Sequence, residues 1–174
     1  MGKRQCGSCS LCCKVLHIPE LNKPVNQWCP HCRPGKGGCS IYADRPDVCR
    51  VYQCGWLSTD KLPESWYPAK SHFLVQTNDD DTVLYVHVDQ GFPSAWRKEP
   101  YYAELLVMAR EFLVVVEVGN NRILLRPDGT EVPSYLSKNG SLFDRAKAER
   151  PRDTKTKRAI QDIADLFNEQ NRPL

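Results

Sequence analysis

The sequence predicts an α+β protein in which a loop-rich, metal-bound cysteine module precedes a small antiparallel sheet with a covering helix. All nine cysteines lie between Cys6 and Cys54. Proline and glycine interrupt residues 1–60 so often that no long periodic element fits there. Residues 71–126 instead alternate β-rich runs with one helical pattern. We therefore expect a cysteine module over 1–60 and an α+β body over 61–174, forming one compact unit.

The body is expected to begin with a β-hairpin. Residues 71–77 and 82–89 are rich in β-branched and aromatic side chains, and the polar cluster 78–81 between them is typical of a turn. The second run alternates as a half-buried strand does. Its two faces carry Leu84, Val86 and Val88 on one side and Tyr85 and His87 on the other.

A helix and a second strand pair are expected next. Pro100 suits the first position of a helix, and the apolar residues of 99–112 share one face at helical spacing. Residues 114–118 include four valines and predict a strand. The turn residues 119–121 should bring residues 122–126 back as its partner.

The tail beyond the sheet is polar and basic over residues 137–158, and residues 160–167 predict a short amphipathic helix docked on the body. The basic residues of the tail could suggest a nucleic-acid binder with zinc knuckles. However, acidic residues interrupt them and no aromatic residues are interleaved, so a solvated face is the better interpretation. We do not expect nucleic acid as a partner.

The chemistry of the chain is concentrated in its cysteines. The first four follow the spacing C-x2-C-x2-C-C, and another C-x2-C step occupies residues 29–32. This spacing lets several sulfur atoms converge on one small centre, and soft thiolates select zinc, Cu(I) or iron–sulfur centres. We expect the metal ligands to be Cys6, Cys9, Cys12, Cys13, Cys29, Cys32, Cys39, Cys49 and Cys54.

Structural disulfides are the competing interpretation of these cysteines. A secreted, disulfide-stabilised chain usually carries an N-terminal signal, but no apolar run of signal length follows Lys3 and Arg4. The cysteine count is odd, which would leave one thiol unpaired. No apolar run is long enough to span a membrane. We therefore expect a cytosolic protein with reduced thiols and no membrane partner.

A second motif runs from Cys39 to Arg50 and reads C-S-I-Y-A-D-R-P-D-V-C-R. Together with the first run, it makes residues 4–60 resemble the bacterial C-x2-C-x2-C-C cysteine-cluster proteins, the YkgJ family of zinc- or iron-chelating domains. The resemblance implies a metal-chelating cysteine cluster. Some larger relatives resemble flagellin lysine N-methylases with an iron–sulfur centre, but this chain is shorter and has the additional Cys29 and Cys32, so methyl transfer is not implied.

The spacing leaves two cofactors open. Zinc takes four thiolates in a closed tetrahedron, so eight or nine thiolates would fill two sites, with Cys12 and Cys13 pointing into different sites or bridging them. An iron–sulfur cube also takes four cysteines and often uses closely spaced C-x2-C steps. We expect one or two centres of zinc or an iron–sulfur cluster, with zinc slightly preferred in the isolated protein.

Other roles compete with simple metal binding. An iron–sulfur-dependent enzyme that modifies a protein or peptide is the main alternative; Arg45 or Arg50 would then bind an anionic substrate, although offsetting thiolate charge is the plainer role. His17 or His31 could replace a thiolate ligand. A redox role for the C-P-H-C step would need a strand–helix context that its flanks do not offer. The sequence identifies no particular protein or small-molecule partner.

Overall fold

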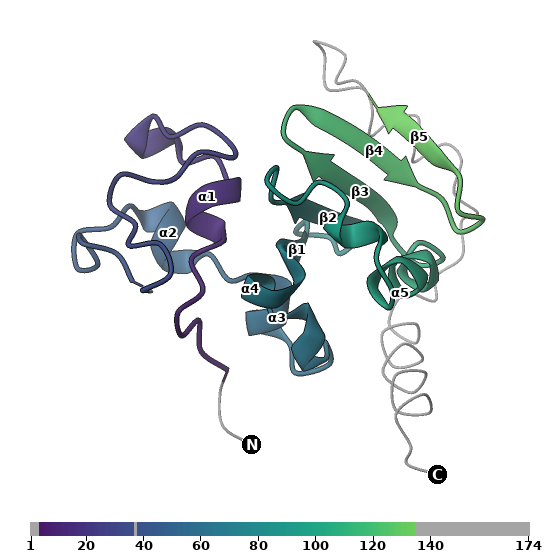
Figure 1. The fold of residues 1–174 in the computed structure, drawn as a ribbon, viewed down its shortest axis with the longest axis horizontal. Coiled ribbons are helices and arrows are strands. Elements are labelled where there is room, and N and C mark those ends of the chain that lie inside the picture. The colour runs from purple at the N-terminus through teal and green to yellow at the C-terminus, as the bar shows by residue number, and fades with distance from the viewer. Residues whose placement is uncertain (1–3, 37, 135–174) are drawn as a thin grey trace.

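A five-stranded sheet lies beside the cysteine-bearing segment in the computed structural model, which describes residues 4–36 and 38–134 (Figure 1). The strands follow one another across the sheet in chain order. Their bounds are β1 Phe73–Thr77, β2 Val83–Val88, β3 Leu113–Val118, β4 Asn121–Leu125 and β5 Glu131–Ser134. The short helices between the two parts pack at the β1 edge of the sheet (Figure 1).

The sheet is mixed, so the expectation of an antiparallel sheet was wrong at one strand pair. Strands β2 and β3 run parallel, with Val83 opposite Leu113 and Val88 opposite Val118. The other three neighbouring pairs are antiparallel. Helix α5, Tyr101–Met108, lies in the connection from β2 to β3. A crossover through a helix returns the chain to the end of the sheet from which it started, and so makes the next strand parallel.

The local elements otherwise follow the sequence patterns. The expected hairpin is confirmed as β1 and β2, and Asn78 Oδ1 closes its turn by accepting hydrogen bonds from the backbone N–H groups of Thr82 (2.9 Å) and Val83 (2.8 Å). The second strand pair is confirmed as β3 and β4. Strand β5 was not expected. As the last strand in the order it lies at the sheet edge, where its Pro133 is tolerated.

The main core fills the face of the sheet that α5 covers. The alternation expected for β2 is confirmed, because Leu84, Val86 and Val88 are buried while the side chains between them are half-buried. Trp66 packs edge-on against Phe73 with ring centroids 5.3 Å apart. Further fully buried side chains of this core include Trp96, Leu105, Val114 and Val116.

The cysteine-bearing segment contributes little to that core. Its short helices are α1 Cys12–Val15, η1 Pro19–Leu21 and α2 Asp47–Val51. Its apolar contact with the sheet among the described residues is a small second cluster, formed by Leu11, Val15 and Leu74 of β1. The segment therefore has too little buried apolar surface to be held by packing alone.

Four further short helices connect or flank these parts: α3 Gly55–Ser58, η2 Glu64–Trp66, α4 Pro68–Ser71 and η3 Ala95–Arg97. Helix α3 belongs structurally to the body, since Trp56 is buried in the main core. The expected basic stretch 137–158 and the helix near 160–167 lie outside the described residues. Within the described part of the chain, no helix has the length and apolar character needed to cross a membrane.

Candidate metal centre

The nine cysteines are free thiols and gather into two groups. Each group combines residues that are far apart in the sequence. The first thiol group consists of Cys6, Cys9, Cys12 and Cys54. The second thiol group consists of Cys13, Cys29, Cys32, Cys39 and Cys49. The adjacent Cys12 and Cys13 thus fall into different groups.

Packing and charge together define the first thiol group. Cys9, Cys12 and Cys54 all pack on the small cluster around Leu11 and Leu74. Burial raises the pKa of the Cys9 thiol, and negative charge on Cys54 or Cys6 raises it further. A charge has a larger effect on its neighbour's pKa the closer the two groups lie, so these effects indicate that Cys6, Cys9 and Cys54 are near one another.

Tyr67 holds the loop that carries the first two cysteines. Its hydroxyl donates a hydrogen bond to the Cys6 carbonyl (2.7 Å) and accepts one from the Cys9 N–H (3.1 Å), which also donates to the Cys6 carbonyl (2.9 Å). Gly7 makes this tight turn with φ of 52°, in the left-handed region that glycine adopts most easily. Arg4 anchors the entry to the loop by donating to the Trp56 and Leu62 carbonyls.

Backbone N–H groups face the sulfur atoms of the first group. Burial raises the pKa of Cys54, while the N–H groups of Leu57 and Trp56 partly oppose this effect. The N–H of Leu11 acts in the same way on Cys9. Such donors favour the thiolate, which is the form that binds a metal.

The hydroxyl of Tyr52 is buried beside the first thiol group and has no hydrogen-bond partner among the described residues. Burial raises its pKa well above the usual range, and the charges that raise it further are those of Cys54, Cys12, Cys6 and Cys9. A buried hydroxyl without an acceptor is unfavourable. A thiolate sulfur would supply the missing acceptor.

The second thiol group begins at Cys13, which shares side-chain hydrogen bonds with Cys12 and Cys32. The hydrogen bond with Cys12 and then burial raise the pKa of Cys13 far above its usual range. Burial and the charge of Cys13 raise the pKa of Cys32 to about 11. The Cys29 N–H donates to the Cys13 carbonyl at 3.0 Å, so the C-P-H-C step lies directly against α1.

Cys39 and Cys49 complete the second group from the other motif. Cys39 lies opposite Cys32 in an isolated antiparallel bridge. Burial is the main cause that raises the pKa of Cys49. Negative charges on Cys13, Cys29 and Cys39 raise it further. The side chain of Arg45 stacks on Tyr42, 3.8 Å from its ring centroid. The interaction with Tyr42 is the main cause that raises the pKa of Arg45, and negative charge on Cys39 and Cys49 adds a smaller effect.

Lys23 is a buried cation beside the second group, with only 3% of its surface exposed. Its Nζ donates to the carbonyls of Lys14 (2.6 Å) and Leu16, and no carboxylate among the described residues forms a salt bridge with it. Burial lowers its pKa, while negative charge on four cysteines opposes that effect: Cys29, Cys13, Cys12 and Cys32. The buried ammonium therefore has thiols where a carboxylate partner would ordinarily lie.

No group of three or more Cys, His, Asp or Glu side chains within residues 4–36 and 38–134 has the arrangement of a formed metal site. The donor chemistry nevertheless fits a thiophilic metal, because thiolates are its preferred ligands and both thiol groups offer at least four of them. The expected alternative ligand His17 is exposed, and His31 is half-buried. Binding would require the sulfur atoms of each group to draw closer together.

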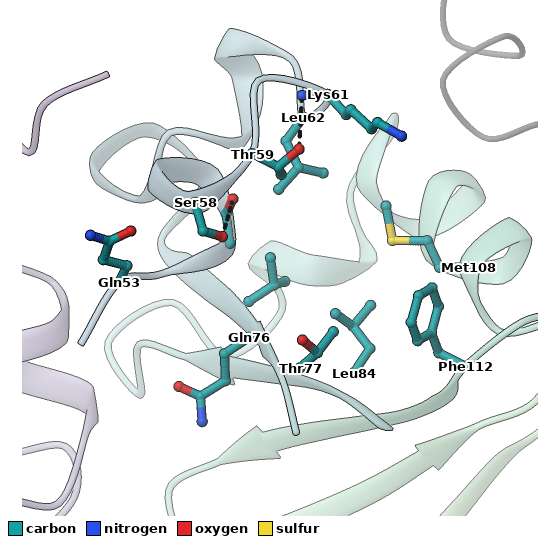
Figure 2. Close-up of a pocket in the computed structure, with 12 residues that line it drawn as sticks. Gln53, Ser58, Thr59, Lys61, Leu62, Gln76, Thr77, Leu84, Met108 and Phe112 are labelled. Atoms are coloured by element: carbon teal, nitrogen blue, oxygen red, sulfur yellow. Dashed lines mark hydrogen bonds between the residues drawn. The ribbon is translucent and has the colours of Figure 1, made fainter. Parts of the chain in front are cut away.

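A mainly apolar pocket of about 340 Å³ adjoins the first group between α3, β1 and the end of α5 (Figure 2). Gln53 and Gly55, which flank Cys54 in the chain, contribute to its wall. In Figure 2, Gln53 and Gln76 lie at one end and Met108 and Phe112 at the other.

A separate polar cluster lies on the sheet face opposite the main core. His87 Nδ1 lies 2.8 Å from Glu117 Oε2, and Arg122 Nε lies 2.5 Å from Glu117 Oε1. Burial alone would raise the pKa of Glu117, but the hydrogen bond from His87 and the positive charges of His87 and Arg122 together hold it below its usual range. The cluster ties β2, β3 and β4 together across their pairing.

Comparisons with protein-family models, curated proteins and solved structures gave no significant match. The argument for the site therefore rests on its residues. Sequence reasoning missed three of them: Tyr52, Lys23 and Tyr67. Only Tyr52 carried a usable signal, because it lies two positions before Cys54.

Proposed function

We propose that this chain is a metal-binding cysteine-cluster protein whose thiolates chelate two metal centres, one in each thiol group. The observation that carries the proposal is that nine free cysteines from separate stretches of the chain lie near enough to influence one another's pKa, in a set of four and a set of five. Thiols crowded in this way are unfavourable as free thiolates, because each charge raises the pKa of its neighbours. A bound cation reverses that balance and deprotonates the thiols.

Folding of the cysteine-bearing segment supports the same function. Between residues 4 and 52 the buried apolar side chains of the described chain are few: Leu11, Val15, Ile18 and Cys29. In small loop-rich segments of this kind, the free energy of metal binding is also the free energy of folding. Metal–sulfur bonds would therefore supply the order that apolar burial does not.

Zinc and an iron–sulfur cluster both suit groups of four or more thiolates. We take zinc as the metal of the isolated protein and an iron–sulfur cluster as the alternative occupant. A zinc ion held by four thiolates has no open position for water or substrate. The role that follows is structural or metal-handling, in keeping with the cysteine-cluster proteins that the sequence resembles.

Elemental analysis of protein purified anaerobically with a reductant tests this function. We expect about two equivalents of zinc per chain, or iron with inorganic sulfide and a brown colour. Cys54→Ser should remove about one equivalent and Cys49→Ser the other, while Ser58→Ala on the exposed side of α3 should remove none. Less than about one equivalent of total metal, with the thiols paired in disulfides, would disprove the proposal.

A further inference from the structure

We infer that the two thiol groups are separate anionic centres with different dedicated partners: the Tyr52 hydroxyl donates a hydrogen bond to sulfur in the first, and the Lys23 ammonium offsets the charge of the second. The inference rests on the proposed function and goes beyond it, because it assigns to each centre a residue that is not a ligand. Donors of this kind tune metal retention and, in iron–sulfur centres, the reduction potential.

Tyr52 is placed to serve the first centre alone. Its hydroxyl is buried and unpartnered among the described residues, and its ring packs with Cys9, Cys12 and Cys54 on the cluster around Leu74. A metal-bound thiolate keeps most of its negative charge and accepts hydrogen bonds well. The hydroxyl has no other acceptor within the described structure, so loading the first centre would satisfy it.

Lys23 is placed to serve the second centre. A zinc ion bound by four thiolates carries a net charge of about −2, which is unfavourable in a buried site unless a cation lies close by. The Lys23 ammonium is buried and held in place by the carbonyls of Lys14 and Leu16. Its remaining hydrogen-bonding capacity and its whole charge are available to the sulfurs of Cys13, Cys29 and Cys32.

The two partners act on nearly separate sets of sulfur atoms. The charges that bear most on Tyr52 come from the first group, and three of the four that bear most on Lys23 come from the second. Only Cys12, next to the shared peptide, acts on both. A change to either partner should therefore alter one centre and leave the other nearly unchanged.

Cadmium-113 NMR of the full-length protein tests this separation without deleting a ligand, because each cadmium–thiolate centre gives its own resonance. We expect two resonances in the cadmium-loaded protein. Tyr52→Phe should shift only one of them and make that cadmium exchange into excess EDTA about tenfold faster, the usual effect of losing a hydrogen bond to a charged acceptor. Lys23→Gln should do the same to the other resonance. Glutamine can still donate to the carbonyls but carries no charge, so the variant isolates the charge of Lys23 from its structural hydrogen bonds.

Tyr101→Phe and Lys70→Gln are the matched controls. Tyr101 loses only a hydrogen bond to the Ser65 carbonyl, and Lys70 only an exposed ion pair with Glu64, so both should leave the two resonances in place. Two bound cadmium ions that respond to neither test variant, or a variant that moves both resonances equally, would overturn this inference alone. If the wild-type protein took up no cadmium, the proposed function would be contradicted as well.

Discussion

Lys14 and Asp89 form a buried ion pair that joins the cysteine-bearing segment to the sheet. Lys14 Nζ lies 2.6 Å from Asp89 Oδ1 and 2.8 Å from Oδ2. Lys14 follows Cys13 in α1, and Asp89 directly follows β2 and also accepts a hydrogen bond from the Gly91 N–H (2.8 Å). The turn of helix that carries a cysteine of each thiol group is thus fixed to the end of a core strand.

Lys14→Met should destabilise the protein by about 3 kcal/mol, because it leaves the buried Asp89 carboxylate without its cation. Urea unfolding of the metal-loaded protein under reducing conditions, followed by tryptophan fluorescence, measures the loss. Lys70→Met removes an exposed ion pair with Glu64 and should cost less than about 1 kcal/mol. Equal losses in the two variants would show that the Lys14–Asp89 pair contributes no more than a surface contact.

Glu117 should make the free energy of unfolding depend on pH in the acidic range. Its pKa in the folded protein lies below the usual carboxyl value, so its contribution is fully present above about pH 4.3 and is lost as the pH falls through the lower folded value. Glu117→Gln should cost about 1–3 kcal/mol at pH 7, since a hydrogen-bonded charge is removed from between His87 and Arg122. The difference between variant and wild type, measured by urea unfolding across the pH range, should shrink towards pH 3. A difference that stayed constant with pH would exclude this assignment.

Gly55→Ala should disturb the first thiol group from outside it. A Cβ at this position would lie 2.9 Å from Val75 Cγ2 and 3.1 Å from the Val75 carbonyl oxygen, so α3 would have to move away from β1. Overpacking of this kind costs about 1–3 kcal/mol. Because Cys54 immediately precedes α3, we also expect weaker metal retention in the first centre, measured by competition with a chelator. Ser58→Ala on the same helix is the control and should leave both quantities unchanged.

Removal of metal should loosen the cysteine-bearing segment while the sheet persists. Among the described residues from Pro24 to Tyr42, Cys29 and no other apolar side chain is buried, so little packing would hold this stretch without metal. After the metal is removed with a chelator, limited proteolysis should cut first between Pro24 and Tyr42. Fragments containing β1 to β4 should survive longer. The same cleavage pattern and rate before and after chelation would contradict the expectation.

Local patterning was enough to predict the hairpin of β1 and β2, the helix near Tyr101 and the pair β3–β4. It could not predict that β2 and β3 are parallel neighbours. Periodicity reports which face of a strand is buried, whereas strand direction depends on how a distant crossover packs. The edge strand β5 was also missed; it is short and contains Pro133, so its sequence carries little strand signal without knowledge of its edge position.

The candidate ligands followed from cysteine spacing, but their division into two groups did not. Cys54 joins Cys9 only because α3 packs on β1 beside the small cluster around Leu74. Lys23 has no sequence signal at all, since a single lysine between loop residues is ordinarily exposed. Lys23 is buried because its ammonium binds the carbonyls of Lys14 in α1 and of Leu16 just after α1. These contacts arise only in the tertiary structure.

One peptide bond joins Cys12 to Cys13 and therefore belongs to both proposed centres. The centre that binds its metal first would fix the backbone of α1 at these two residues. The cysteine of the other centre extends from that same stretch of backbone. The second ion would then enter a site whose backbone is already partly ordered, so its binding would lose less conformational entropy. Uptake of the two ions should accordingly show weak positive cooperativity, while each centre still binds its own ion when the other centre is lost.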